Sequence, residues 1–285
     1  MTEVATSDQL LVVIDPVARH GDGEAVRIAK DVLSAGATTK VCLPDGPDEF
    51  DRALARRGSR RPVVIGDDRA LSRAVSVLHR RRELAGCALS LVPVGADDAA
   101  LTLSRALGVP MGAVAAARAV LDGSERRLDL LVDDSDGVVL GALRIPPLGG
   151  SADSPEAGGP PHPPHWLRTC QSLVRTLAAR PARPAASASP GPARLRVEAD
   201  GRTLIDLDQP VEAVSITPAG AGGGARIEIR PVSVGAEAAP LEAVARTITV
   251  SGADFRYRAD AVVAGPVRTR TWTAREGAWG LTLPR

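Results

Sequence analysis

The predicted fold follows from one stretch of the chain, Val63-Val64-Ile65-Gly66-Asp67-Asp68-Arg69-Ala70-Leu71. Three β-branched apolar residues run into a glycine and two carboxylates, and apolar residues at helical spacing then continue to Leu78. This pattern is typical of a buried parallel strand that enters a helix through a tight loop. In an open α/β sheet such a loop lies at the carboxyl end of its strand, where ligands usually bind. The chemistry that residues 66–70 support is therefore the first guide to function.

Further strands and helices alternate on both sides of this stretch. Apolar runs predict strands, and residues of helical period between them predict helices. The predicted strands are residues 10–14, 39–43, 88–92, 128–132 and 138–145, and the predicted helices are residues 24–33, 48–57 and 112–121. Asp15-Pro16 ends the first strand, and residues 17–23 are predicted to form a loop that contains Gly21 and Gly23. The alternation predicts a Rossmann-like parallel α/β domain over residues 1–145.

The composition changes at Pro146. Residues 146–165 are rich in Pro, Gly, Ser and Asp and are predicted to be a linker or loop. An amphipathic helix is predicted over residues 166–179, and short strands separated by Gly and Pro follow from residue 193. The number of these strands predicts that residues 166–285 form a C-terminal β-sandwich domain. The predicted fold class is thus α/β followed by all-β.

Charge and composition limit the classes of function. Lys and Arg total 35 against 34 Asp and Glu, so the formal net charge of +1 does not favour a nucleic-acid partner. The first nine residues are polar and do not resemble a signal peptide, and the three cysteines lack metal-ligand spacing. We therefore expect a cytoplasmic protein. Peripheral contact with the inner face of a membrane and a homodimeric state are left open.

The basic run Arg80-Arg81-Arg82 follows the helix that starts after the opening stretch. Two interpretations apply to it. Cationic side chains at a helix C-terminus interact favourably with the helix dipole, which favours a solvated helix end. A surface that faces a membrane is the alternative.

Three sequence motifs occur in the order found in a known family. Ile14-Asp15-Pro16 leads to Gly21 and Gly23, Gly66 to Ala70 follows the next buried strand, and Pro93-Val94-Gly95-Ala96 follows the one after that. They resemble the Asn-Pro, Gly-Gly-Asp-Gly-Thr and Pro-x-Gly-Thr motifs of the diacylglycerol kinase catalytic-domain family, the bacterial lipid kinases. That family shares a nucleotide-binding half with NAD kinases.

The later part of the chain resembles the same family. The segment from Phe255 to Asp260 resembles the approach to the family's Asp-Gly-Glu, and residues 277–284 resemble its closing strand, which usually packs back on the first domain. The resemblance covers nearly the whole chain and depends on order and spacing more than on identical motifs.

The resemblance implies ATP-dependent phosphoryl transfer to a lipid hydroxyl at a membrane surface, with ATP and Mg²⁺ as cofactors. Asp260 would be the catalytic residue that orients the hydroxyl, and Asp68 would help to hold Mg²⁺. The residues expected around the nucleotide are Asp15, Gly21, Gly23, Gly66, Asp67, Asp68, Arg69, Gly95 and Ala96.

The chain departs from the family at the positions that would contact phosphate. Asp67, Arg69 and Ala70 stand where the family has Gly, Gly and Thr, and Ala96 replaces another Thr. A Cβ hinders close approach of the backbone to phosphate, and a carboxylate repels it. After Asp260, alanine and valine replace Gly and Glu. The second hypothesis is therefore a non-catalytic relative of the same fold that has a binding or regulatory role.

Overall fold

The computed structural model describes residues 9–147, 192–220, 223–232 and 239–285. Residues 1–147 and 192–285 form one compact unit, and every statement below concerns the described part of that unit. Most of the predicted linker at 146–165, and the predicted helix at 166–179, lie outside the described residues. None of the described helices is both long enough and apolar enough to span a membrane.

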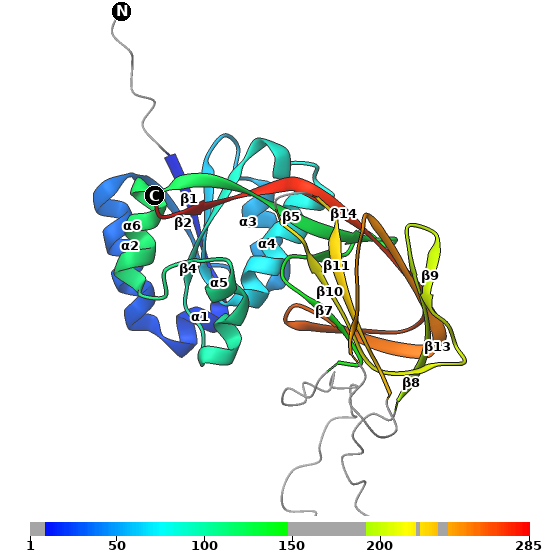
Figure 1. Cartoon of the computed structure of the whole chain (residues 1–285). Helices are drawn as coiled ribbons and strands as arrows, with labels where there is room; N and C mark the ends of the chain where they lie inside the picture. The colour runs from blue at the N-terminus through cyan, green and yellow to red at the C-terminus, as the bar shows by residue number, and fades with distance from the viewer. Residues whose placement is uncertain (1–8, 148–191, 221–222, 233–238) are drawn as a thin grey trace, which may run out of the picture. The chain divides into compact units, whose positions relative to one another are not determined.

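A four-stranded parallel sheet forms the N-terminal half (Figure 1), with the strand order β4-β3-β1-β2. Its strands are β1 (Gln9–Ile14), β2 (Thr38–Cys42), β3 (Arg61–Gly66) and β4 (Ala88–Pro93). The α-helices are α1 (Pro16–Gly21), α2 (Gly23–Gly36), α3 (Pro47–Ala55), α4 (Asp68–Arg80), α5 (Thr102–Ala106) and α6 (Ala113–Asp122). Two short 3₁₀ helices, η1 (Leu84–Gly86) and η2 (Asp98–Leu101), precede β4 and α5.

Alternate side chains of β3 face opposite sides of the sheet, as the two-residue period of a strand requires. Val64 packs in a core with residues of α3 and α4, while Val63 and Ile65 pack in a second core with residues of α2 and α6. All three side chains are fully buried, so β3 reads as a continuous apolar run. Helices therefore cover both faces of the parallel sheet, with α3 and α4 on one side and α2 and α6 on the other (Figure 1).

The second half is rich in strands, as the sequence predicts. Its strands, together with those that lead into it, are β5 (Ser124–Asp133), β6 (Val138–Val139), β7 (Leu143–Ile145), β8 (Ala193–Ala199), β9 (Arg202–Ile205), β10 (Pro210–Pro218), β11 (Ala225–Pro231), β12 (Leu241–Ala245), β13 (Thr247–Ala259) and β14 (Val262–Leu283). The pairings among these strands are antiparallel, and they enclose a separate apolar core that contains Trp272. That they form the two facing sheets of a sandwich stays a prediction.

The long strand β14 connects the two halves. Its first part pairs with β13, and its last part lies between β5 and β4, where Gly280 and Leu281 pair in parallel with Ala88 and Leu89. A buried hydrogen bond of 2.9 Å from Ser90 Oγ to Thr282 Oγ1 joins the same two strands. Hydrogen bonding is thus continuous from the parallel strands into the antiparallel ones.

Two local predictions are wrong. Residues 17–23 are not a loop, because Asp15 and Pro16 start helix α1: the Asp15 carboxylate accepts the Val17 N–H at 2.9 Å, and proline suits the first helical position. Asp22 caps α2 in the same way by accepting the Ala25 N–H at 2.9 Å. The strand predicted over residues 138–145 is interrupted, because residues 140–142 turn their N–H groups toward Asp260 instead of a neighbouring strand.

Candidate functional site

The carboxyl ends of β1, β3 and β4 bring together most of the residues that the family resemblance selects. The Asp15 N–H donates to the Ile65 carbonyl at 2.9 Å, and the Val94 N–H donates to the Gly66 carbonyl at 2.9 Å. Asp15, Gly66 and Gly95 therefore lie on three adjacent strand ends. Gly21 and Gly23 lie in helices, since Gly21 ends α1 and Gly23 begins α2.

Close packing explains the retained glycine of β3. A Cβ on Gly66 would lie 2.7 Å from the Cβ of Ala70 and 3.0 Å from the Cβ of Asp15. A Cβ on Gly95 would likewise lie 3.0 Å from Leu101 Cδ2. Because Gly66 and Gly95 have no side chain, neighbouring side chains pack directly against their backbone.

Asp67 occupies the amino end of α4. Its carboxylate accepts the Ala70 N–H at 2.9 Å, as an N-cap residue does. Burial raises the pKa of Asp67, and the nearby charge of Asp15 acts in the same direction. The exposed Arg69 also interacts with this carboxylate. At this helix end, where a phosphate would accept backbone N–H groups, the Asp67 carboxylate already accepts one.

Asp68, the predicted metal ligand, is only 3% exposed. One oxygen accepts the Leu103 N–H at 2.6 Å, and the other accepts the Ser104 N–H at 2.9 Å together with the Ser104 hydroxyl. Both oxygens are thus used to hold the first turn of α5 against α4. Ser104, which the sequence analysis did not select, is a buried partner whose role no local motif indicates.

Asp260, the predicted catalytic residue, lies at the turn between β13 and β14 in a left-handed backbone conformation with φ of 49°. Its carboxylate accepts the N–H groups of Leu140, Gly141 and Ala142 at 2.7, 2.8 and 3.0 Å. Burial raises the pKa of Asp260 despite these bonds, and the charge of Asp68 adds to the increase. The two aspartates are therefore close enough to interact.

Gly141 links these two aspartate sites. A Cβ on Gly141 would lie 2.6 Å from Leu103 Cδ1 and 3.2 Å from Asp260 Oδ1. The residue therefore fits between the α5 turn that Asp68 holds and the carboxylate of Asp260. A glycine inside a predicted strand is the one sequence signal that points to such a close approach.

Ala96 is exposed and contributes no polar side chain. The following residue, Asp97, accepts the Ala100 N–H at 2.9 Å and so caps η2. Among the residues that the structure describes, no group of three His, Cys, Asp or Glu side chains is arranged to hold a metal ion.

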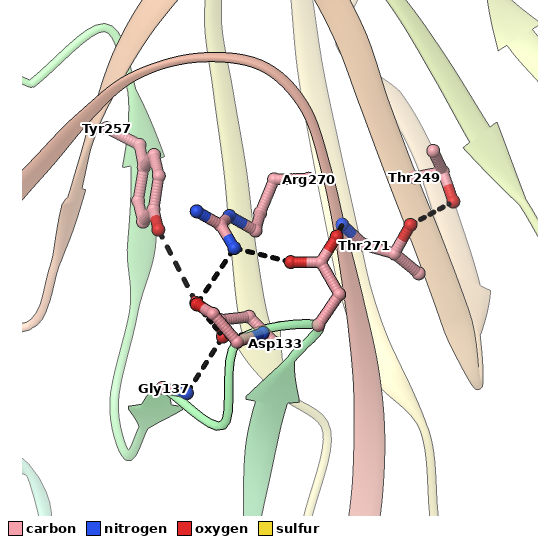
Figure 2. A network of polar contacts seen from close by, with 8 residues as sticks. Asp133, Gly137, Thr249, Tyr257, Arg270 and Thr271 are labelled. Atoms are coloured by element: carbon pink, nitrogen blue, oxygen red, sulfur yellow. Dashed lines mark hydrogen bonds and ion pairs between the residues drawn. The ribbon is translucent and has the colours of Figure 1, made fainter.

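A second polar network lies where β5 meets β14 (Figure 2). Arg270 Nη1 donates to Asp134 Oδ1 and, at 2.8 Å, to Ser135 Oγ, while the Tyr257 hydroxyl lies 3.5 Å from Asp133 Oδ2. Although burial acts to raise it, hydrogen bonds from Gly137 and Ser135 hold the pKa of Asp133 below its ordinary value. This network fixes the turn after β5 and includes no residue that the family resemblance selects.

Comparisons with known proteins identify the fold. No protein-family model matches the chain, and no curated protein matches it. Among solved structures, the chain is similar to a crystal structure of a diacylglycerol kinase from Bacillus anthracis str. Sterne, with a TM-score of 0.68 and 13% identity over 98% of this chain and 97% of that chain. A second structure from the same organism gives a TM-score of 0.69 at 12% identity, covering 98% of both chains.

At this level of identity the likeness concerns the fold alone. The chain therefore has a diacylglycerol kinase-like fold along nearly its whole length, which confirms the resemblance at the level of architecture.

Proposed function

We propose that this chain is a non-catalytic binding or regulatory protein built on the diacylglycerol kinase-like fold. The observation that carries the proposal is that carboxylates of the chain itself occupy the N–H groups at the helix starts along the candidate site. Asp15 caps α1, Asp67 caps α4, Asp97 caps η2, and Asp68 holds the N–H groups of α5. A helix N-terminus is a natural phosphate site, and an internal carboxylate competes directly for it.

The residues present do not fit Mg²⁺ and ATP in the arrangement that the family implies. Both oxygens of Asp68 already accept hydrogen bonds in a buried setting. Leaving a buried donor unpaired costs about 1–3 kcal/mol, and like charges about 4 Å apart repel by ~4 kcal/mol at an effective dielectric constant of 20. Together Asp15 and Asp67 therefore oppose a polyphosphate at this edge.

A second candidate function is the ATP-dependent lipid kinase. It is favoured by the fold likeness over nearly the whole chain and by the electrostatic proximity of Asp68 to Asp260. For this function, a metal ion or a lipid hydroxyl would have to share carboxylate oxygens that already accept backbone N–H groups.

A thermal-shift titration with millimolar ATP and Mg²⁺ separates the two functions. We expect no shift for the natural chain. A variant with Asp67→Gly, Arg69→Gly and Ala70→Thr removes the competing carboxylate and restores the hydroxyl donor, so we expect it to gain a shift. The matched control is Asp45→Gly, because Asp45 is an exposed aspartate whose ion pair within the described ranges is with Arg19.

An assay of phosphate transfer from ATP to diacylglycerol in mixed micelles completes the test. Labelled lipid formed by the natural chain would contradict the proposal and establish the kinase. A shift with ATP but no labelled lipid would show that nucleotide binding survives without transfer.

A further inference from the structure

A pocket of about 570 Å³ lies at the carboxyl end of α4, away from the candidate site. The thirteen residues of α4 put this end about 20 Å from Asp68, at 1.5 Å of rise per residue. The volume is within the range of small-molecule sites, roughly 300–1,000 Å³. The pocket is lined by the end of α4 and the turn after it, by β5, by the connections before β11 and β13, and by β14.

Three arginines, Arg82, Arg246 and Arg275, line this pocket and are exposed. None of them forms an ion pair with any residue in the described ranges, whereas the neighbouring Arg57 and Arg81 both pair with Glu83 at 2.8 Å. Guanidinium groups offer paired planar donors that match carboxylate or phosphate oxygens. These guanidinium groups could therefore bind an anion in the pocket.

The charge balance favours a dianion. Among the described lining residues, the three guanidinium groups and the carboxylate of Glu276 together carry a formal charge of +2. A phosphate monoester carries about −1.5 to −2 at pH 7, which neutralises this charge more closely than a single carboxylate does.

The remaining lining residues are apolar. Leu84 and Leu130 are buried side chains at the pocket wall, and three alanines complete the apolar surface: Ala85, Ala274 and Ala278. A ligand with a compact hydrocarbon group beside its phosphate would cover this surface.

The backbone at Arg82 is unusual in a way that supports a role for its side chain. The Arg82 N–H donates to the His79 carbonyl at 2.8 Å and the Glu83 N–H donates to the Leu78 carbonyl at 2.9 Å, which is a Schellman cap. Arg82 has a φ of 58°, a left-handed conformation that normally selects glycine and is unfavourable for residues with a side chain. The chain therefore holds an arginine at the pocket where a glycine would be more stable.

We propose that this arginine-lined pocket binds a phosphate monoester that carries an apolar group. The ligand is either a soluble alkyl or aryl phosphate or the headgroup of a phosphatidic acid in a membrane. The proposal is independent of the function of the strand-end site.

The test measures binding of two probes to the full-length chain. Isothermal titration with phenyl phosphate at about 1 mM or below detects the soluble source, and sedimentation with phosphatidylcholine vesicles that contain roughly one fifth phosphatidic acid detects the membrane source. The variant Arg82→Gln, Arg246→Gln, Arg275→Gln should weaken whichever probe binds by about tenfold or more. Arg202→Gln, a change at an exposed arginine of β9, should leave binding unchanged.

A second variant is expected to bind more tightly, and a folding defect cannot cause tighter binding. Glu276→Gln removes the one carboxylate among the described lining residues and should strengthen binding several-fold, because the local charge rises. Binding of either probe that the triple variant loses and Glu276→Gln strengthens supports the proposal, and the probe that binds names the source. If neither probe binds the natural chain, or the triple variant binds equally well, the proposal is overturned.

Discussion

The two ends of helix α4 differ in whether their charged side chains have partners within the protein. At its amino end, Asp67 caps the helix and Asp68 holds α5, so the anion-binding capacity of the dipole is met from within. At its carboxyl end, Arg82 lies in a pocket with two further arginines that lack ion-pair partners among the described residues. A shared fold therefore does not determine which end of a helix offers free charge: the fold around α4 is diacylglycerol kinase-like, while the arginines without an ion pair among the described residues lie at the carboxyl end of the helix.

The largest expected effect tests whether Asp68 is a structural residue. Asp68→Ala should lower the free energy of unfolding by ~4 kcal/mol, because it leaves the N–H groups of Leu103 and Ser104 buried without an acceptor. Chemical denaturation measures the change. Asp98→Ala is the control: Asp98 is 93% exposed and should shift stability by less than about 0.5 kcal/mol. Unchanged stability in Asp68→Ala would show that the Asp68 carboxylate is not needed to hold α5. The amino end of α4 would then have a free charge, as its carboxyl end does.

Asp260→Ala should cost about 3 kcal/mol of stability, since three backbone N–H groups lose their acceptor. Asp260→Asn keeps one acceptor oxygen and should lose less. The matched control is Asp254→Ala, in which an exposed aspartate loses its ion pair with Arg268. Denaturant melts of the three variants give the comparison. A fully stable Asp260→Ala variant would free this carboxylate for a catalytic role and weaken the proposed non-catalytic function.

Gly66→Ala tests the packing at the strand end. Its Cβ would meet Ala70 and Asp15 at 2.7 and 3.0 Å, so a loss of about 1–3 kcal/mol is expected from overpacking. Gly21→Ala, where no atom lies within 4 Å of the new Cβ, should instead be neutral or slightly stabilising in its helix. The difference in melting temperature between the two variants checks this prediction, and equal values would refute the packing explanation.

The smallest expected effect concerns the pH dependence from Asp67. Burial raises the pKa of Asp67 in the folded chain, so its contribution to stability is complete below its unfolded pKa and is lost as the pH rises through the folded pKa. Asp67→Ser keeps an N-cap acceptor without the charge. The stability of the serine variant relative to the natural chain should therefore increase from acidic to neutral pH, measured by denaturation at a series of pH values. A constant difference would indicate that Asp67 is not desolvated.

The sequence predicted the parallel sheet well because its signals are local. The fully apolar run of β3 and the helical period of α4 leave few alternatives, and both elements form where they were expected. The helix at residues 16–21 is not predicted, because Gly21 and Gly23 favour a loop there, although Asp followed by Pro is a standard helix start.

The candidate site was harder to predict because its partners are distant in sequence. Asp260 bonds to N–H groups about 120 residues earlier, and Asp68 to residues 35 and 36 positions later. Order and spacing identified both aspartates, but nothing near either residue indicates that its oxygens are already used. Whether a carboxylate is free for chemistry is a tertiary property, and here the fold rather than the motif determines it.

The pairing of β14 with β4 has a consequence for how the chain is made. Ala88 pairs with Gly280, so the edge of the parallel sheet is completed by a strand that is synthesised long after β4. Until then the nascent N-terminal half exposes the unpaired edge of β4, a surface that can pair with other chains. Ribosome-bound intermediates of this protein should therefore depend on chaperones until β14 has been synthesised, and the two halves should acquire their native stability together.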